Sequence, residues 1–409
     1  MLRSRILVLV LLTLCISVMA YAGGFQLNEA GARAMAQAGA FAARANDGSA
    51  IFFNPAGLAF QKDASICLGT TVIFPKTSFY GPYQNNSNER TDLEAAVFTP
   101  INFYAATPLP WLDGLSVGFG VDNPFGLGTT WPDNWVGKFI TVDVQLQSFY
   151  FTPTIAYRVA DFLSIGAGFN YVTGHVSIKR AVATPFSTPD GKEPRVDIDM
   201  NGTGIGWNAG ALLKITPEIS LGVSYRSSAK VDADGDATFT PAYSALPTGG
   251  AAASLTLPPT GFAGIAYTTE DFDIEADYQY IGWSTYDKLS IEFAKDNSVS
   301  ESPKDYQNTY ILRLGGEYRF EKWQLRAGFL YDHSPVKLEF SEPLLPDADR
   351  FGYNIGFGYK LTDNLNVDFA WLFLKFKERK AENTVPEINF DGTYKSYANL
   401  FGVNFEYKF

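Results

Sequence analysis

One short stretch contains all three groups of a hydrolytic triad. Asp332, His333 and Ser334 supply a carboxylate, an imidazole and a hydroxyl, the groups that many acyl-transfer enzymes use. Consecutive residues at a strand end point to opposite faces, however, so a hydrogen-bonded relay among these three side chains is difficult to form. We therefore expect a protein that is not an enzyme, with no catalytic residue and no cofactor.

A second stretch has part of the spacing of a calcium-binding loop. Asp232, Asp234 and Asp236 alternate as the first ligands of such a loop do, but the twelfth position is Tyr243 and not a glutamate. We expect an acidic loop there and no metal site. Cys67 is the one cysteine beyond the N-terminal apolar run, so neither an intramolecular disulfide nor a thiolate cluster is expected.

Four basic residues are candidates for holding an anionic ligand. Lys179, Arg180, Lys304 and Arg313 could form a charge-assisted contact with a carboxylate head group. Each is more often a solvated loop cation or a partner of a nearby carboxylate, and a neutral ligand requires none of them. The net charge of −11 argues against nucleic acid, which is bound by basic patches.

The N-terminal residues have the features of an export signal. Two arginines precede an apolar run at 6–19, and the tripeptide AYA that follows has the pattern at which signal peptidase cuts. We expect residues 1–22 to be a signal peptide and the mature chain to begin at Gly23. No later run is long enough for a transmembrane helix, whereas 15% aromatic residues and 37 glycines are typical of an outer-membrane β-barrel.

Alternation with a period of two residues recurs along the remaining chain. Apolar and polar side chains alternate in 204–213, 272–280 and 351–361, so that one face suits lipid and the other a lumen. A soluble β-sandwich also alternates, but rarely sets aromatics so persistently opposite a polar row. Tight turns lie at 110–114, 160–161, 216–218, 268–271, 321–322 and 362–364, and longer loops at about 80–94, 123–143, 179–202, 233–256, 294–305, 338–349 and 381–393. Six turns and seven loops predict a fourteen-stranded antiparallel transmembrane β-barrel over residues 63–409, with both termini periplasmic.

Residues 23–62 do not alternate. An Ala-rich segment at 30–45 is followed by IFFNPAGLAF at 51–60, where Pro and Gly exclude a helix interior or a central strand and the apolar side chains exclude water. A fourteen-stranded barrel has a lumen too wide for wall side chains to fill. We therefore expect residues 23–62 to form a partly helical hatch inside the barrel. The expected gate residues are Phe25, Phe52, Phe53, Asn54, Pro55 and Ala56.

These segments resemble the FadL-type transporters of long-chain fatty acids and aromatic hydrocarbons. The resemblance rests on GFQLNEAG, NDGSAIFFNPAGLA, DYQYIGWSTYDKL, PDADRFGYNIGFGY and the ending FGVNFEYKF, which follow one another along the mature chain. It implies a fourteen-stranded barrel closed by an N-terminal hatch. In that family a kink in the third strand is associated with a lateral exit, and the matching residues here are Asp122, Asn123, Pro124, Phe125 and Gly126.

The inward faces predict a charged lower lumen and an apolar upper lumen. Three carboxylates within 272–280 and three arginines on the next two strands point inward, so we expect cross-strand pairs that stabilise the wall. The inward residues higher up, expected to line a substrate pocket, are Leu330, Leu372, Leu374 and Phe376. Apolar surface that faces water costs about 25 cal/mol per Å², so the hatch, loops or a ligand should cover it.

The leading hypothesis is passive transport of hydrophobic molecules across the outer membrane of a Gram-negative-type bacterium. Long-chain fatty acids would be captured at extracellular loops, bind in the upper lumen and leave laterally past the hatch. Monoaromatic hydrocarbons are the alternative cargo; a general aqueous porin and an outer-membrane hydrolase are the alternative functions. The expected partners are hydrophobic small molecules, outer-membrane lipid and lipopolysaccharide, and the barrel-assembly machinery, which would read the last strand ending in Phe409. We expect a monomer that binds no nucleic acid.

Overall fold

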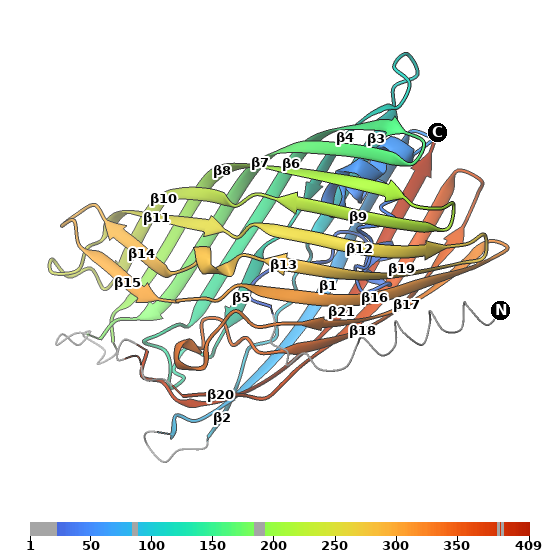
Figure 1. Cartoon of the computed structure of the whole chain (residues 1–409). Coiled ribbons are helices and arrows are strands. Elements are labelled where there is room, and N and C mark those ends of the chain that lie inside the picture. Colours follow the sequence, from blue (N-terminus) through green and yellow to red (C-terminus); the bar gives the residue numbers. More distant parts are fainter. Residues whose placement is uncertain (1–22, 84–88, 184–192, 383–384, 386–387) are drawn as a thin grey trace.

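A single antiparallel sheet curls on itself until its first strand meets its last (Figure 1). The computed structural model describes residues 23–409 except 84–88, 184–192, 383–384 and 386–387. Within this range β1 (Ser65–Tyr80) pairs with β21 (Gly392–Lys408) along the whole length of β1. This closure pairs the backbone N–H and C=O groups of the first and last strands, which would otherwise lack partners in lipid.

The wall contains fourteen strands, as the turns and loops of the sequence predict. In sheet order they are β1, β3 (Ile101–Pro108), β4 (Leu115–Asp122), β6 (Asp143–Ala160), β7 (Leu163–Ala181), β8 (Arg195–Lys214), β9 (Ile219–Arg226), β12 (Thr260–Thr268), β13 (Phe272–Ile281), β16 (Thr309–Phe320), β17 (Trp323–Asp332), β18 (Arg350–Lys360), β19 (Leu365–Phe376) and β21. The tight turns between them gather at one end of the barrel, together with the C-terminus (Figure 1). We call this end the turn end and the opposite one the loop end.

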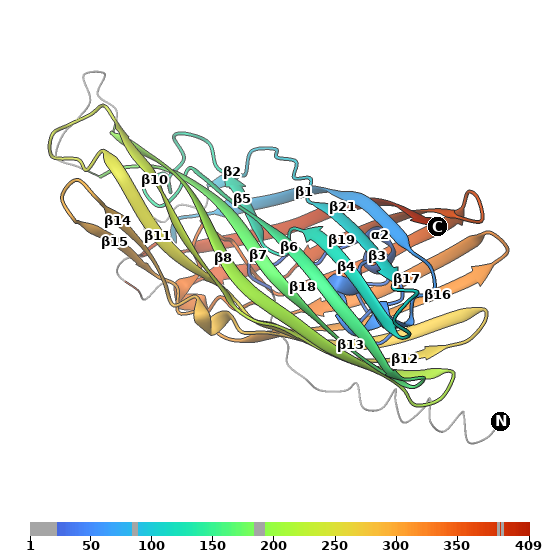
Figure 2. The ribbon, with the colours of Figure 1, turned by 90° about the horizontal axis from the view of Figure 1, so that it is seen from above.

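Shorter strands extend the sheet at the loop end. They are β2 (Arg90–Asp92), β5 (Gly126–Thr130), β10 (Ala229–Thr240), β11 (Gly249–Leu257), β14 (Lys288–Phe293), β15 (Val299–Pro303) and β20 (Arg379–Ala381). Among these, β10, β11, β14 and β15 pair in succession and project together from the barrel (Figure 2). The loop predicted at 233–256 is therefore wrong. Asp232, Asp234 and Asp236 alternate on the exposed face of β10, because the period of two continues through residues that the composition suggested were a loop.

Burial alternates along the wall strands as the sequence pattern predicts. On β13, Phe272, Ile274 and Tyr278 are exposed, whereas the acidic residues between them are buried. The apolar side chains thus form the outer surface and the charges face the lumen. No helix within the described ranges has the length and apolar character that a membrane crossing requires.

The lumen is occupied by the N-terminal segment, which enters it as short helical turns (Figure 1). These are α2 (Ala32–Met35), α3 (Ala50–Phe53) and the 3₁₀ helix η1 (Pro55–Phe60). Pro55 begins η1, where its missing N–H costs no hydrogen bond. Every residue of α3 is buried, and Ile51 and Phe53 pack with Tyr104 and Leu212 of the wall in one apolar cluster.

Candidate functional site

The backbone of the hatch is hydrogen-bonded to carboxylates of β13. Asp277 accepts from the N–H groups of Phe41 and Ala42 at 2.9 and 3.0 Å, and Glu275 accepts from that of Ala43 at 2.6 Å. Both carboxylates are buried. Three backbone hydrogen bonds to two buried carboxyl groups therefore hold residues 41–43 against the wall.

Arg44 of the hatch binds the same strand. Its guanidinium donates to Glu275 at 2.6 Å and to Asp273 at 3.1 Å, with all three side chains buried. The expected cross-strand pairing is present for Asp273 and Arg319, at 2.6 Å, but Glu275 and Asp277 bind the hatch instead. Alternation in the sequence identifies the inward face; it does not reveal that a segment with free N–H groups fills the lumen.

A second hatch arginine extends this network along the neighbouring wall strands. Arg33 lies 3.3 Å from both Asp47 and Glu317, and Glu317 also pairs with Arg326 at 2.7 Å. Arg326 in turn contacts Asp368 of β19 at 2.5 Å. The sequence pattern did not single out either hatch arginine. The available signal was the presence of arginines in an otherwise Ala-rich segment that is expected to be buried, since a buried charge needs a partner.

Replacing Arg44 with methionine should loosen the hatch, because Glu275 would lose its hydrogen-bonded cation. Breaking a buried pair by removing one partner costs about 3–5 kcal/mol, so amide hydrogen exchange in residues 41–43 should accelerate by roughly two to three orders of magnitude. Arg158→Met is the matched control, because Arg158 pairs at an exposed turn with Asp113. Equal exchange rates in the two variants would contradict this role of Arg44.

Asn54 fixes the bend that follows α3. Its Nδ2 group donates to the carbonyl oxygens of Ala42 and Ala211 at 2.8 and 3.0 Å, and its Oδ1 atom accepts from the N–H of Ala56 at 3.2 Å. One fully buried side chain therefore joins two parts of the hatch to β8 and caps η1. Asparagine suits this position because its amide both donates and accepts.

The predicted gate residues 52–56 lie together against the wall. Phe52 and Phe53 pack on Phe262 of β12, with ring centroids 6.4 and 6.0 Å apart. Pro55 approaches β7 so closely that a Cβ at Gly166 would lie 2.5 Å from its carbonyl carbon. Only glycine leaves room for this contact.

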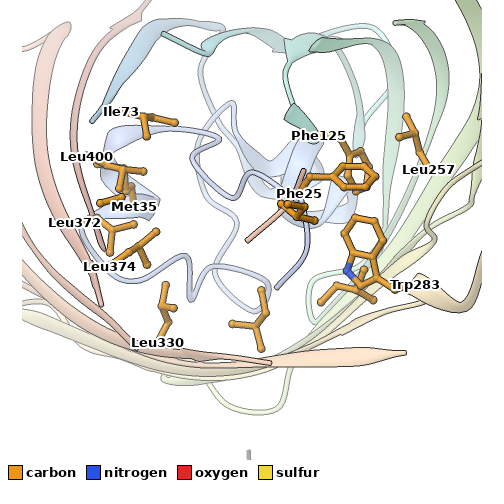
Figure 3. Packing of buried hydrophobic residues seen from close by; sticks show 14 of the residues in the cluster. Phe25, Met35, Ile73, Phe125, Leu257, Trp283, Leu330, Leu372, Leu374 and Leu400 are labelled. Carbon is orange, nitrogen blue, oxygen red and sulfur yellow. The ribbon is translucent and has the colours of Figure 1, made fainter. Parts of the chain in front are cut away.

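Phe25 lies apart from the other gate residues, in an aromatic cluster toward the loop end. Its ring centroid is 4.5 Å from that of Trp283, which begins the 3₁₀ helix η3 (Trp283–Thr285), and 6.2 Å from that of Phe125. Figure 3 shows these rings on one side of the lumen. The aliphatic residues on the facing side are Met35, Ile73, Leu330, Leu372, Leu374 and Leu400.

The third wall strand is interrupted where the sequence suggests a kink. β4 ends at Asp122 and β5 begins at Gly126, and both pair with β6. Pro124, inside the break, has no N–H to continue the ladder. No other strand in the described ranges pairs with the far side of β5. Two backbone hydrogen bonds reach β5 from other segments, one from the N–H of Glu94 to the carbonyl of Thr130 and one from the N–H of Gly126 to the carbonyl of Phe25.

The start of the hatch pairs directly with this kink. Gln26 and Phe125 form an antiparallel β-bridge. Their chain neighbours supply its two hydrogen bonds, at 2.8 and 3.0 Å. Any movement of the first hatch residues therefore changes the hydrogen bonding of the kink.

A cavity of about 650 Å³ lies between the hatch, the kink and the wall. Phe25 and Leu374 line its inner part, whereas Val97 and Ile101 line its outer part and are exposed on the barrel surface. The lining of this cavity thus combines residues buried in the barrel with residues exposed on its surface, and it includes residues 126–130 of β5. Its size and largely apolar lining are those of a small-molecule site.

The predicted pocket residues divide between two neighbouring cavities. Leu374 and Phe376 line the 650 Å³ cavity. Leu330 and Leu372 line a smaller one, which shares Leu374 and contacts Met35 of the hatch. All four thus face the upper lumen.

Of the predicted head-group cations, Arg313 lines the smaller cavity together with Leu330 and Leu372. Arg313 donates to the carbonyl of Ala38 at 2.6 Å, and Lys304 forms a buried ion pair with Glu342. Arg180 lies near the loop end of β7. None of these three cations is among the described residues that line the 650 Å³ cavity.

Arg350, at the start of β18, does line this cavity. Its Nε atom donates to Asp332 at 2.6 Å, and its guanidinium carbon lies 5.5 Å from the ring centroid of Phe376. Lys76, an exposed residue of β1, is a second cation on the cavity lining. The sequence reasoning missed both. Arg350 could have been found from its place one residue before the alternating run 351–361.

The three groups of the apparent triad bind different partners. Asp332 pairs with Arg350, and the Ser334 hydroxyl donates to Asp347 at 2.6 Å. The ring of His333 packs edge-on against Tyr310, and burial lowers the pKa of His333 to about 3. The described contacts thus contain no Asp–His–Ser relay.

Comparisons with known proteins agree with this architecture. The sequence model of one family, described as outer membrane protein transport protein (OMPP1/FadL/TodX), matches residues 13–409. Outer membrane protein P1 of Haemophilus influenzae is 27% identical over 95% of this chain and 96% of its own. A long-chain fatty acid transport protein of Escherichia coli O6:H1 is 25% identical over 96% of each chain. The crystal structure of a Pseudomonas aeruginosa FadL homologue superimposes with a TM-score of 0.84 at 22% identity, covering 95% of this chain and all of the other.

Proposed function

Because the chain belongs to the outer membrane protein transport protein family (OMPP1/FadL/TodX), we propose that it is a passive carrier of hydrophobic molecules across the outer membrane. The observation that supports this proposal is the cavity, whose lining includes hatch residues, residues of β5 and residues exposed on the barrel surface. An aqueous porin would need an open bore instead. Here most hatch residues between Gly23 and Ala59 are buried inside the barrel, which argues against an open bore.

In the proposed route the loop end faces the outside of the cell and both termini face the periplasm. A hydrophobic molecule enters between the loops, binds in the cavity and leaves through the gap beside β5. The bridge between Gln26 and Phe125 must open or shift for the molecule to pass. Long-chain fatty acids are the proposed cargo, as the names of several relatives suggest, and monoaromatic hydrocarbons are the alternative.

The test is uptake by cells that lack their own fatty-acid importer and express this chain. We expect labelled oleate to accumulate faster than in cells carrying the empty vector. Toluene uptake without oleate uptake would select the alternative cargo. Rapid swelling of protein-containing liposomes in sugar solutions would overturn the proposal in favour of an aqueous porin.

The substitution Arg350→Gln should weaken the binding of an acidic cargo and leave the binding of a neutral cargo unchanged. Hydrogen bonds to charged groups contribute about 1.5–3 kcal/mol, so the affinity for oleate should fall roughly tenfold or more while toluene binding stays unchanged. Lys76→Gln is the matched control, because the exposed side chain of Lys76 should contribute little. Equal loss of oleate and toluene binding in Arg350→Gln would indicate damage to the cavity and contradict a head-group contact.

A further inference from the structure

Removal of the signal peptide would place a new charge inside the barrel. Gly23, the first described residue, is buried, and a Cβ on it would lie 2.7 Å from the guanidinium of Arg350. Cleavage after the AYA tripeptide leaves an α-amino group on Gly23. Such a group ordinarily has a pKa of about 7.7–8.0 and is positively charged at neutral pH.

A buried carboxylate lies within reach of this amino group. Asp347, on the loop between β17 and β18, accepts from the N–H of Gly24 at 2.9 Å and from the hydroxyl of Ser334 at 2.6 Å. Its side chain is buried, and burial raises the pKa of the Asp347 carboxyl. The Gly23 nitrogen is one residue from the N–H that already contacts Asp347, so a small rotation brings the two charges together.

The charges around Gly23 are unbalanced. Arg350 interacts electrostatically with three carboxylates, Asp332, Asp347 and Glu29, but forms its ion pair with Asp332. In the part of the chain that the structure describes, neither Asp347 nor Glu29 has a basic side chain within ion-pair distance. Two further arginines lie near this cluster. Arg313 donates to a backbone carbonyl and an amide oxygen, and Arg379, which interacts electrostatically with Asp347, donates to a hydroxyl and a backbone carbonyl. Buried charges need partners, and Asp347 thus lacks a cation that contacts it directly.

We propose that the α-ammonium group of Gly23 in the mature chain is the counter-ion of Asp347, and that Asp347 thereby positions the start of the hatch. Residues 25–27, which follow directly, pair with the kink. An unprocessed chain has an amide at Gly23 and cannot form the pair. Docking of the hatch on the kink is then completed by cleavage, whatever the cargo is, so this proposal does not depend on the transport hypothesis.

The proposed ion pair between Gly23 and Asp347 can be tested by the rate at which the α-amino group is acylated. The intact mature protein, folded in detergent, is treated with an amine-acylating reagent at pH 7, and labelling of its N-terminal peptide is followed by mass spectrometry. Ion pairing keeps the amine protonated, so we expect labelling at least about tenfold slower than in the unfolded protein. Labelling as fast as in the unfolded protein, or a mature chain that begins elsewhere than Gly23, would overturn the proposal.

Variants separate ion pairing from simple burial. Asp347→Asn keeps the size of the side chain and an acceptor for Gly24 but removes the charge, so labelling should accelerate by roughly tenfold. Asp347→Glu should restore slow labelling. Asp349→Asn is the matched control, because Asp349 pairs with Lys377 at 2.8 Å. An unchanged rate in folded Asp347→Asn would overturn the proposal.

If Asp347→Asn does not fold, a measurement on the protein without substitutions tests whether the α-amino group of Gly23 is ion-paired. The α-amino group is reductively methylated with ¹³C, and its pKa is read from the NMR shift as the pH is varied. A pKa above the ordinary value of about 8 supports the ion pair. A pKa at or below that value overturns it.

Discussion

Deleting residues 46–57 should turn a closed barrel into an ion-conducting pore. The deletion removes α3 and the start of η1, including Ile51 and Phe53, which are fully buried among wall side chains. A fourteen-stranded barrel cannot fill its lumen with wall residues alone, so conductance in planar bilayers should rise by at least about tenfold.

The matched control for this deletion is removal of residues 184–192, which lie between β7 and β8 and outside the hatch. Both proteins must first show the heat-dependent shift in gel mobility of a folded barrel. A folded deletion variant that conducts no better than the full chain would show that the hatch is not the obstruction, and the proposed gate would then be abandoned.

Cross-linking the hatch to the kink should stop transport reversibly. Gln26 and Phe125 face each other in the bridge, and their neighbours make the flanking hydrogen bonds. In such non-hydrogen-bonded pairs the Cα atoms are about 4.5 Å apart, which a disulfide can span. In a Cys67→Ser background, oxidised Gln26→Cys/Phe125→Cys should take up cargo at least about tenfold more slowly, because a gate that cannot open limits the rate. A reductant should restore uptake.

A disulfide in the closure seam is the control for this experiment. Thr77 and Ser396 face each other across β1 and β21 with their hydroxyl oxygens 2.8 Å apart, so Thr77→Cys/Ser396→Cys joins two wall strands and leaves the hatch free. Uptake should be unaffected there. If the Gln26–Phe125 disulfide forms completely, as mass spectrometry would report, and uptake does not change, the cargo does not need this bridge to open.

The architecture of the wall could be predicted because strands that cross a membrane alternate apolar and polar side chains with a period of two residues. Alternation in 272–280 and 351–361 identifies the inward face residue by residue, and the short turns fix the strand count. At 233–256 the composition suggested a loop, whereas the alternation continues there and the residues form β10 and β11 beyond the wall strands. Period-two patterning does not report where the bilayer ends.

The contacts inside the barrel were less predictable. Apolar character placed the hatch in the lumen, but the partners of Arg33 and Arg44 are more than two hundred residues away along the chain, apart from Asp47. No local spacing encodes such pairs. Arg350 was missed although it directly precedes the alternating run 351–361, because alternation gives the face of a side chain and not the cavity that it lines.

The hatch also spans the line where the sheet closes. The N–H of Ala32 donates to Asn404 on β21 at 2.7 Å, and the amide of Asn404 donates to the Cys67 sulfur on β1 at 3.2 Å. The N-terminal segment therefore helps to hold the first and last strands together, and it is synthesised before either of them. During assembly, the N-terminal segment should therefore dock before β1 pairs with β21 and closes the barrel. Exchanging this segment between distant relatives should lower assembly yield unless residues of both seam strands are exchanged with it.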